Sequence, residues 1–264
     1  MYEEYWKLKE KPFENTPDPR FLYLSSQHEE GFSRLLYVIK ENKGAGMLTG
    51  LFGCGKTLLG RALLSELPKD LYKIAFVTNP RLSDVDLLRM IVFQLGKEES
   101  LSGKTNILVA LEKLLKDNFR DGRKTLVIID EAHSIEDSNI FEEIRLLLNF
   151  QMNDKFLLTL LLLGQPELRE KVELSKQLEQ RMAMKYHLEG LSKTDTINYI
   201  NHRLKVAGGE HINWTETASI MIYERSGGIP RRINQICDTA LLVGYGHKAD
   251  KIDENIIKEV LDTL

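Results

Sequence analysis

Short apolar runs alternate with segments of helical periodicity over the first two thirds of the chain. Five runs have the length of strands: 47–49, 72–78, 125–129, 156–163 and 184–188. Five segments repeat apolar residues at helical spacing: 26–42, 58–67, 84–95, 105–119 and 138–150. Strands that are apolar on both faces are typical of a parallel sheet covered by helices on each side. The pattern therefore predicts an α/β fold class, with 184–188 as an edge strand.

The strand pattern stops near Gly190, and only helical segments follow it. These are 194–206, 215–226, 230–245 and 253–263. We therefore expect an α/β domain over 26–190 and a smaller all-helical domain over 191–264. Residues 1–25 are rich in aromatic residues, and Pro17 and Pro19 oppose a helix there. This segment is predicted to be an extended arm that belongs to the α/β domain.

Composition narrows the classes of protein that fit. With 264 residues, 42% hydrophobic and 28% charged, the chain has globular values. Its net charge of −3 gives no global attraction to nucleic acid. Cys54 and Cys237 are the two cysteines and lack zinc-site spacing, which favours a reducing, cytoplasmic compartment. The longest apolar run, 156–163, is too short for a membrane span, and the charged N-terminus does not resemble a secretory signal.

The strongest motif is a glycine-rich phosphate loop over 50–57, which matches G-x-x-x-x-G-K-[ST]. A predicted strand precedes it and a predicted helix follows it, so an incidental turn is disfavoured. Lys56 is expected to reach the β- and γ-phosphates, and the Thr57 hydroxyl to bind Mg²⁺. The predicted nucleotide-binding residues are Gly50, Gly53, Cys54, Gly55, Lys56, Thr57 and Leu58.

A second motif, Asp130-Glu131, ends the apolar run 125–129. Asp130 is placed to hold Mg²⁺, and Glu131 to polarise the water that attacks the γ-phosphate. The letters from Asp130 to His133 also spell the DEAH of a helicase class. That class needs two tandem sheet domains, and this chain has room for one. His133 is therefore interpreted as incidental.

Three further polar residues could couple hydrolysis to an assembly. Gln165 follows the run 156–163, at the sheet edge where ligands bind, and could orient the attacking water; a turn residue is the alternative. Thr159 lies inside that run and is less well placed. Arg181 could be an arginine finger donated to a neighbouring subunit or a solvated helix residue, and Arg169 is a weaker candidate.

The third of these residues is Arg231. Pro230 suits the first position of a helix, so Arg231 would project from its first turn and could reach a phosphate. Arg232 would point about 100° away around the helix. A basic cap on a surface helix is the alternative.

With these residues in view, the chain resembles an AAA+ ATPase, specifically the general secretion pathway protein A (ExeA-like) family. The distinctive strings are TPDPRFLY at 16–23, GQPEL at 164–168 and GGIPRRIN at 227–234. The resemblance extends over essentially the whole chain. It implies a P-loop NTPase sheet of five parallel strands in the order 5-1-4-3-2, sandwiched by helices and followed by a helical AAA+ lid.

The resemblance also implies roles for the candidate residues, with ATP and Mg²⁺ as cofactors. Lys56 and Thr57 fall in Walker A, Asp130 and Glu131 in Walker B, Arg181 at the arginine finger and Arg231 at sensor 2. Gln165 departs from the Asn, Thr or Ser usual at sensor 1. The N-terminal arm could bring Phe13 or Phe21 onto the adenine, with core packing as the alternative.

Two functional classes follow from this resemblance. The leading hypothesis is a cytoplasmic, Mg²⁺-dependent ATPase that acts as a homo-oligomer, with active sites at subunit interfaces. It would remodel or regulate a protein assembly in secretion or pilus biogenesis, at the inner face of the membrane through partners or a further C-terminal segment. The competing hypothesis is a DNA-dependent regulator of transposition or another DNA transaction. Its DNA face could be formed by Lys116, Arg120, Arg123 and Lys124, with a solvated helix end as the alternative. Besides these two classes, a nucleotide-dependent switch that hydrolyses little ATP is a third hypothesis.

Overall fold

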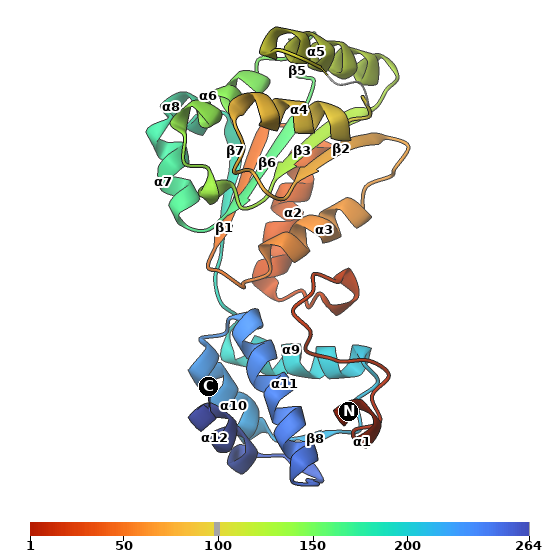
Figure 1. Cartoon of the computed structure of the whole chain (residues 1–264), viewed down its shortest axis with the longest axis vertical. Coiled ribbons are helices and arrows are strands. Elements are labelled where there is room, and N and C mark those ends of the chain that lie inside the picture. Colours follow the sequence, from red (N-terminus) through yellow and green to blue (C-terminus); the bar gives the residue numbers. More distant parts are fainter. Residues whose placement is uncertain (98–100, 264) are drawn as a thin grey trace. The chain divides into compact units, whose positions relative to one another are not determined.

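Five parallel strands form one sheet in the order β2-β3-β6-β1-β7 in the computed structural model, which describes residues 1–97 and 101–263 (Figure 1). The strands are β1 (Ala45–Gly50), β2 (Tyr72–Val77), β3 (Lys124–Ile129), β6 (Thr159–Gly164) and β7 (Met182–Leu188). Numbered along the chain, this order is 5-1-4-3-2. The predicted fold class and the edge position of the last strand are confirmed.

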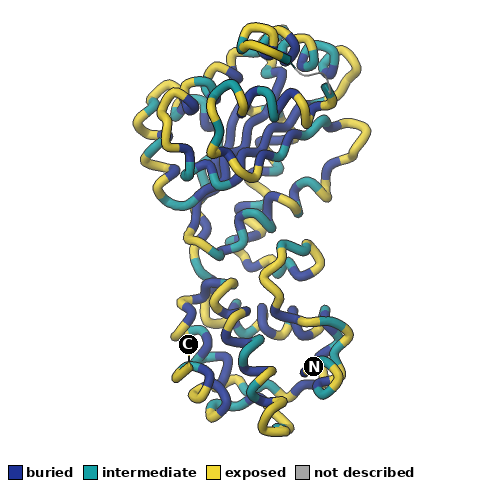
Figure 2. Tube along the Cα trace, viewed as in Figure 1, coloured by how far each residue is buried: buried dark blue, intermediate teal, exposed yellow. Residues whose placement is uncertain are grey.

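The central strands are buried on both faces because helices cover each side of the sheet (Figure 2). Along β6, Leu160 and Leu162 belong to the core beneath α4 (Asp84–Gln94), α5 (Lys104–Arg120) and α6 (Ser138–Leu147). The alternate residues Leu161 and Leu163 face α2 (Ser26–Lys40) and α3 (Lys56–Ser65). This period-two alternation fixes the register β1–β6 and β3–β6, since a one-residue slip would exchange the two cores.

The apolar run 156–163 does not form a single strand, which corrects the prediction. Its first residue pairs in a small antiparallel hairpin of β4 (Gln151–Met152) and β5 (Lys155–Phe156). The hairpin turns through Asn153 and Asp154, which both have positive φ. The chain then re-enters the sheet at Thr159. Two short helices between β6 and β7 were also not predicted: α7 (Glu167–Leu174) and α8 (Lys176–Glu179).

The C-terminal helices form a second compact unit with a core of its own. They are α9 (Lys193–Val206), α10 (Glu216–Ser226), α11 (Pro230–Gly246) and α12 (Glu254–Thr263). Besides these predicted helices, two-residue strands β8 (Asn213–Trp214) and β9 (Lys251–Ile252) pair in parallel. The expectation of an all-helical domain is therefore corrected by this short ladder.

The N-terminal segment packs with these helices, so its predicted assignment to the α/β domain is wrong. Tyr2, Trp6 and Phe13 are buried in the same core as α9, α10, α11 and α12. The Trp6 indole N–H donates to Leu241 O at 2.9 Å. The segment also contains α1 (Tyr2–Tyr5) and the 3₁₀ turn η1 (Pro19–Phe21), so it is not fully extended. Its aromatic side chains bury more apolar area there than a solvated arm would.

Two compact units therefore divide the chain, and their boundaries interleave. The sheet unit contains 29–50 and 59–188, and the helical unit contains 1–28, 51–58 and 189–264. The phosphate loop is grouped with the helical unit, although it follows directly from strand β1. Among the described residues, no helix is both long enough and apolar enough to cross a membrane.

Candidate functional site

The phosphate loop begins where β1 ends, at Gly50. A Cβ on Gly50 would lie 2.6 Å from Leu188 O, so the close approach of β7 excludes any side chain there. Gly53 and Gly55 have φ of +87° and +96°, which L-residues rarely adopt. Positive φ at these positions is what lets successive backbone N–H groups turn into one concavity that binds an anion. The geometry is that of a phosphate cradle.

Two buried side chains fix the inside of this loop. Lys56 is 5% exposed, and its Nζ donates to Leu51 O at 3.0 Å. His28 lies 3.2 Å through Nε2 from Cys54 O, and its Nδ1 lies 2.7 Å from Ser25 Oγ. Since a carbonyl only accepts, Nε2 carries the proton and Nδ1 accepts from the serine hydroxyl. Burial lowers the pKa of His28, which keeps the ring neutral.

Arg231 meets the same loop from the first turn of α11. Its backbone N–H donates to Gly53 O at 3.3 Å, and its guanidinium carbon lies 4.2 Å from the centre of the Phe52 ring. A cation over an aromatic face at this distance is an attractive contact. A Cβ on Gly53 would come within 2.7 Å of Arg231 Cβ. Arg231 therefore lies in the first turn of a helix, as predicted. Its close approach is also one reason why position 53 requires glycine.

Asp130 and Glu131 follow directly from the end of β3. Asp130 is buried, and its Oδ1 accepts from the Glu131 backbone N–H at 2.9 Å. Glu131 has a φ of +53°, a left-handed conformation that costs a non-glycine residue roughly 1–3 kcal/mol. This left-handed conformation turns the chain sharply from β3 into η2 (Ala132–Ser134). The Glu131 side chain remains partly exposed.

Gln165 and His133 lie together, a contact that sequence reasoning missed. Gln165 follows β6, the strand next to β3, and its Nε2 is 2.9 Å from His133 Nε2. The same ring nitrogen is 3.6 Å from Glu131 Oε2. His133 was interpreted as incidental because no hydrolysis motif requires it. The contact could have been predicted from the strand order, in which β3 and β6 are neighbours, because residues just past neighbouring parallel strands meet at one edge of the sheet.

The two arginine-finger candidates differ in environment. Arg181 is half-buried in the turn before β7, and its Nη1 is buried without a hydrogen-bond partner among the described residues. Arg169 is exposed and pairs with Glu173 on α7 at 2.8 Å. An exposed pair one helical turn apart is an ordinary surface contact. Because Arg169 already has a carboxylate partner, Arg181 is the better candidate for a partner outside this chain.

The predicted adenine-stacking residues are both core residues. Phe13 is 2% exposed and packs at 5.9 Å from the Trp214 ring. Phe21 is 5% exposed and lies beneath the Arg203 guanidinium at 4.7 Å. The core-packing alternative therefore describes these residues, and neither ring is available to stack on a base.

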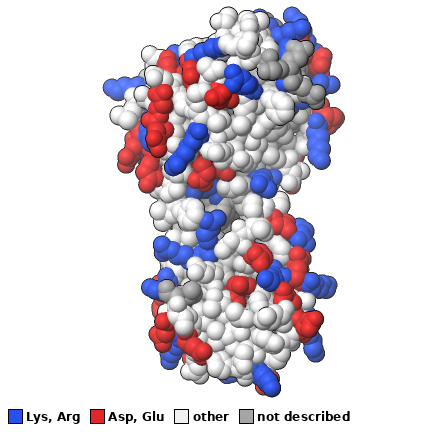
Figure 3. All heavy atoms as spheres, viewed as in Figure 1, with Lys and Arg blue, Asp and Glu red and all other residues white. Residues whose placement is uncertain are grey.

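The four cations of the candidate DNA face are already engaged. Lys116 pairs with Glu112, Arg120 with Asp117, and Arg123 with Asp121. The Lys124 ammonium donates to Lys40 O at 2.5 Å. Over the visible surface, acidic and basic side chains are interspersed (Figure 3). Three of the four cations thus have a carboxylate partner, which reduces the positive charge that this face offers to a phosphate backbone.

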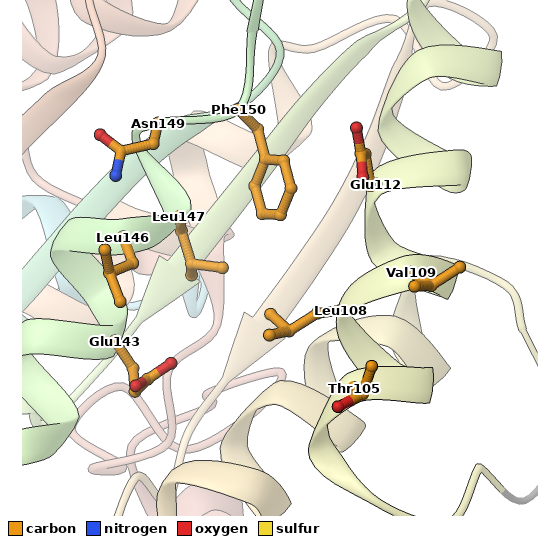
Figure 4. Close-up of a pocket in the computed structure, with 9 residues that line it drawn as sticks. All are labelled: Thr105, Leu108, Val109, Glu112, Glu143, Leu146, Leu147, Asn149 and Phe150. Atoms are coloured by element: carbon orange, nitrogen blue, oxygen red, sulfur yellow. The ribbon is translucent and has the colours of Figure 1, made fainter.

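An apolar hollow in the sheet unit lies between α5 and α6 (Figure 4). It encloses about 390 Å³, and Leu108 and Leu147 point toward one another across it. Glu112 and Glu143 line it, but no cation does. With two carboxylates and no cation in its lining, the hollow is electrostatically unfavourable for a phosphate, and the nucleotide is not expected there.

The residues present fit a nucleotide accompanied by Mg²⁺ better than a metal held by protein alone. No group of three or more His, Cys, Asp or Glu side chains capable of binding a metal occurs within 1–97 and 101–263. Mg²⁺ commonly uses one or two protein ligands and completes its shell with water and substrate phosphates. The Thr57 hydroxyl and the Asp130 carboxylate are of the required oxygen type.

Comparisons with known proteins agree with this description. A family model described as an AAA domain matches residues 39–172. General secretion pathway protein A of Aeromonas hydrophila is 38% identical over 256 residues, which cover 96% of this chain and 46% of the relative. The chain thus spans about half the length of that relative.

Two solved structures share the fold. The ORC2 protein of Aeropyrum pernix, in ADPNP and ADP complexes, has a TM-score of 0.73 at 19% identity; the match covers 97% of this chain and 72% of that one. The RuvB Holliday junction branch migration motor of Thermotoga maritima has a TM-score of 0.62 at 19% identity, covering 89% and 69%. Likeness at this identity shows the fold alone.

Proposed function

Because the chain belongs to the AAA domain family, we propose that it binds ATP with Mg²⁺ and hydrolyses it to ADP and phosphate. The observation that carries the proposal is the loop 50–57, with left-handed glycines at 53 and 55, a buried Lys56 and Arg231 beside it. A buried ammonium inside a glycine-rich turn is the group that a loop of this sequence uses to bind phosphate oxygens.

Each strand tip and loop residue then has a chemical task. Lys56 would neutralise the β- and γ-phosphates, and Thr57 and Asp130 would hold Mg²⁺, which would offset the negative charge of the phosphates. Glu131 polarises the attacking water, and Gln165 orients that water. Arg231 stabilises charge on the phosphates.

We further propose that the chain works as an oligomer that remodels or regulates a protein assembly. The name of the Aeromonas hydrophila relative points to secretion as the setting. Arg181 would act in trans, on the nucleotide of a neighbouring subunit. DNA is the weaker candidate partner because the proposed DNA face is internally paired.

The ATPase proposal is tested by separating binding from turnover. Lys56→Ala should abolish binding of a fluorescent ATP analogue, because the phosphates lose their buried cation. Glu131→Gln should preserve binding and lower phosphate release by about 10²-fold or more. Full ATPase activity in Glu131→Gln would overturn its assignment as the base. Measuring wild-type turnover with and without duplex DNA separates the two candidate partners.

Action of Arg181 in trans is tested by mixing two inactive variants. Subunits with Arg181→Ala keep an intact loop, and subunits with Lys56→Ala keep the arginine. If the finger acts across an interface, mixed oligomers recover part of the activity, with a maximum at intermediate ratios. No recovery at any ratio would show that Arg181 does not act across subunits.

A further inference from the structure

One ring nitrogen of His133 faces two residues that the proposed function assigns to hydrolysis. Its Nε2 lies 2.9 Å from Gln165 Nε2 and 3.6 Å from Glu131 Oε2. Glu131 and His133 follow β3, and Gln165 follows the neighbouring β6. His133 thus lies at the junction between the water-polarising carboxylate and the amide at the next strand tip.

A neutral imidazole carries one proton, so Nε2 cannot serve both neighbours in the same way. With the proton on Nε2, the ring can donate to the Glu131 carboxylate once the 3.6 Å separation shortens, and Gln165 must turn its amide oxygen toward the ring. With the proton on Nδ1, Nε2 accepts from the Gln165 amide N–H, as the 2.9 Å contact allows, and has no proton to offer the carboxylate. The position of the ring proton, on Nε2 or on Nδ1, therefore decides both how the Gln165 amide is oriented and whether Glu131 can accept from the ring.

The rest of the ring is not tied by a competing contact. His133 Nδ1 is buried and has no hydrogen-bond partner among the described residues. A histidine with a purely structural role usually has one nitrogen fixed by a carbonyl or carboxylate, which sets the tautomer. Here the tautomer is set only at Nε2, by Glu131 and Gln165.

The backbone around His133 is held firmly, although the ring tautomer is not. The ammonium of Lys171, on α7, donates to His133 O and to Ile135 O, both at 2.6 Å. A Cβ on Gly164 would lie 3.1 Å from the His133 backbone nitrogen, so the end of β6 closes against this turn. The side chain is 16% exposed, which keeps water from replacing its partners freely. A fixed backbone carrying a ring with two hydrogen-bonding states is suited to transmit a rotation of Gln165.

We propose that His133 is a positioning residue that couples the rotation of the Gln165 amide to the orientation of the Glu131 carboxylate during ATP hydrolysis. The inference rests on the proposed function, because it assumes that Glu131 polarises the attacking water. His133 itself does not touch the nucleotide. Removing it should slow turnover and leave nucleotide binding intact, since His133, Glu131 and Gln165 belong to the sheet unit, whereas the phosphate loop is grouped with the helical unit.

The kinetic test compares His133→Ala and His133→Gln with the wild type. His133→Ala should lower kcat by about 10- to 100-fold, the scale of a misplaced acid–base group, with KM and ADP affinity within about twofold. His133→Gln keeps an amide that can donate to a carboxylate and should recover part of the loss. His247→Ala is the matched control, because His247 is exposed and pairs with Glu259 on the helical unit. Unchanged kcat in His133→Ala would overturn the proposal.

A double-mutant cycle distinguishes positioning from general damage to the fold. If His133 acts through Gln165, the His133→Ala/Gln165→Ala variant should be no slower than the worse single variant. Multiplying losses would show that the two residues act independently and would overturn the coupling. A fall in ADP affinity matching the fall in kcat would instead show a structural role.

The tautomer can also be followed without turnover. In long-range ¹H–¹⁵N spectra of the imidazole nitrogens, Gln165→Ala and Glu131→Gln should each shift the His133 resonances and leave those of His247 unchanged. Unshifted His133 resonances in both variants would overturn the inference even in a chain that hydrolyses slowly. If Glu131→Gln keeps full activity, the proposed function fails. If Glu131→Gln is inactive and His133→Ala is fully active, only the present inference fails.

Discussion

The sheet unit and the helical unit are built from the chain in different ways. Most of the sheet unit comes from one continuous stretch, 59–188, with one helix and one strand from 29–50. The helical unit joins three segments that are far apart in sequence: 1–28, 51–58 and 189–264. The strand tips at 130–133 and 165 belong to the first unit, and the phosphate loop is grouped with the second.

This difference predicts a division of labour between the units. The strand tips are held by neighbours in the sheet and by local contacts such as that of Lys171 with His133 O. The loop is held by His28, from the segment 1–28, and by Arg231, from the segment 189–264. Damage to the helical unit should therefore weaken nucleotide binding, whereas damage at the tips should slow turnover.

The largest effect on stability is expected from Arg203, which ties the N-terminal segment to α9. Arg203 is 4% exposed and donates to Pro12 O, Glu14 O and the Tyr199 hydroxyl. Arg203→Met leaves these acceptors buried and unpaired, so the helical unit should lose about 3 kcal/mol of unfolding free energy. The measurement is urea unfolding followed by tryptophan fluorescence.

Tryptophan fluorescence reports the helical unit alone, because both tryptophans of the chain, Trp6 and Trp214, belong to it. The control is Lys205→Met, which removes an exposed pair with Glu210 in the same helical unit and should cost less than about 1 kcal/mol. An Arg203→Met chain that unfolds at the wild-type urea concentration would show that the N-terminal segment does not stabilise the helical unit.

The sheet unit was largely predictable from the sequence, for a physical reason. Strands covered on both faces must be apolar at every position, so runs such as 125–129 stand out without knowledge of their neighbours. The order 5-1-4-3-2 did not come from such runs and depended on family resemblance. The run 156–163 was misread because Leu157 and Leu158 are buried outside any strand, and burial alone does not distinguish a strand from a packed loop.

The helical unit was predictable element by element, but not as an assembly. Each helix has its own periodicity, yet nothing in residues 1–25 indicates that Trp6 packs near Leu241. Such contacts depend on the shape of the whole core. The same limit applies to the candidate site: the motif residues were found, while His28 and His133 were missed because their importance lies in contacts with a backbone carbonyl and with Gln165.

The contact between the loop and α11 is tested next, by adding one methyl group. Gly53→Ala must accommodate a φ of +87° and a Cβ placed 2.7 Å from Arg231 Cβ. Either the loop or α11 must shift, so affinity for ADP should fall by about 10-fold or more, equivalent to roughly 1.4 kcal/mol. The measurement is titration with a fluorescent ADP analogue.

Gly122→Ala is the matched control for this substitution. Gly122 also has a positive φ, +73°, but an added Cβ would meet nothing within 4 Å. Both variants share the backbone strain of roughly 1–2 kcal/mol, and only Gly53→Ala has the steric conflict. If the two variants bind ADP equally well, the approach of α11 to the loop does not constrain nucleotide binding.

The smallest expected effect is a pH dependence of the stability of the helical unit, which should arise from His28. Burial lowers the pKa of His28, although its bond to Cys54 O and the charge of Asp195 act in the opposite direction. The folded state therefore keeps the ring neutral, while the unfolded chain takes up a proton near pH 6.5. Below that pH the unfolded state binds more protons, so this contribution to stability is present above pH 6.5 and is lost as the pH falls.

Urea midpoints from tryptophan fluorescence at pH 7.5 and pH 5.5 measure this loss, which should be about 1 kcal/mol for one histidine. His28→Gln retains an N–H for Cys54 O but cannot titrate, so the difference between the two midpoints should shrink. Burial also lowers the pKa of His202 in the same unit, so the difference should persist in part and shrink again in His28→Gln/His202→Gln. A His28→Gln chain with the full wild-type pH dependence would mean that His28 is not held neutral against the loop. Of the two distant segments that contact the phosphate loop, α11 alone would then be left to hold the loop in place.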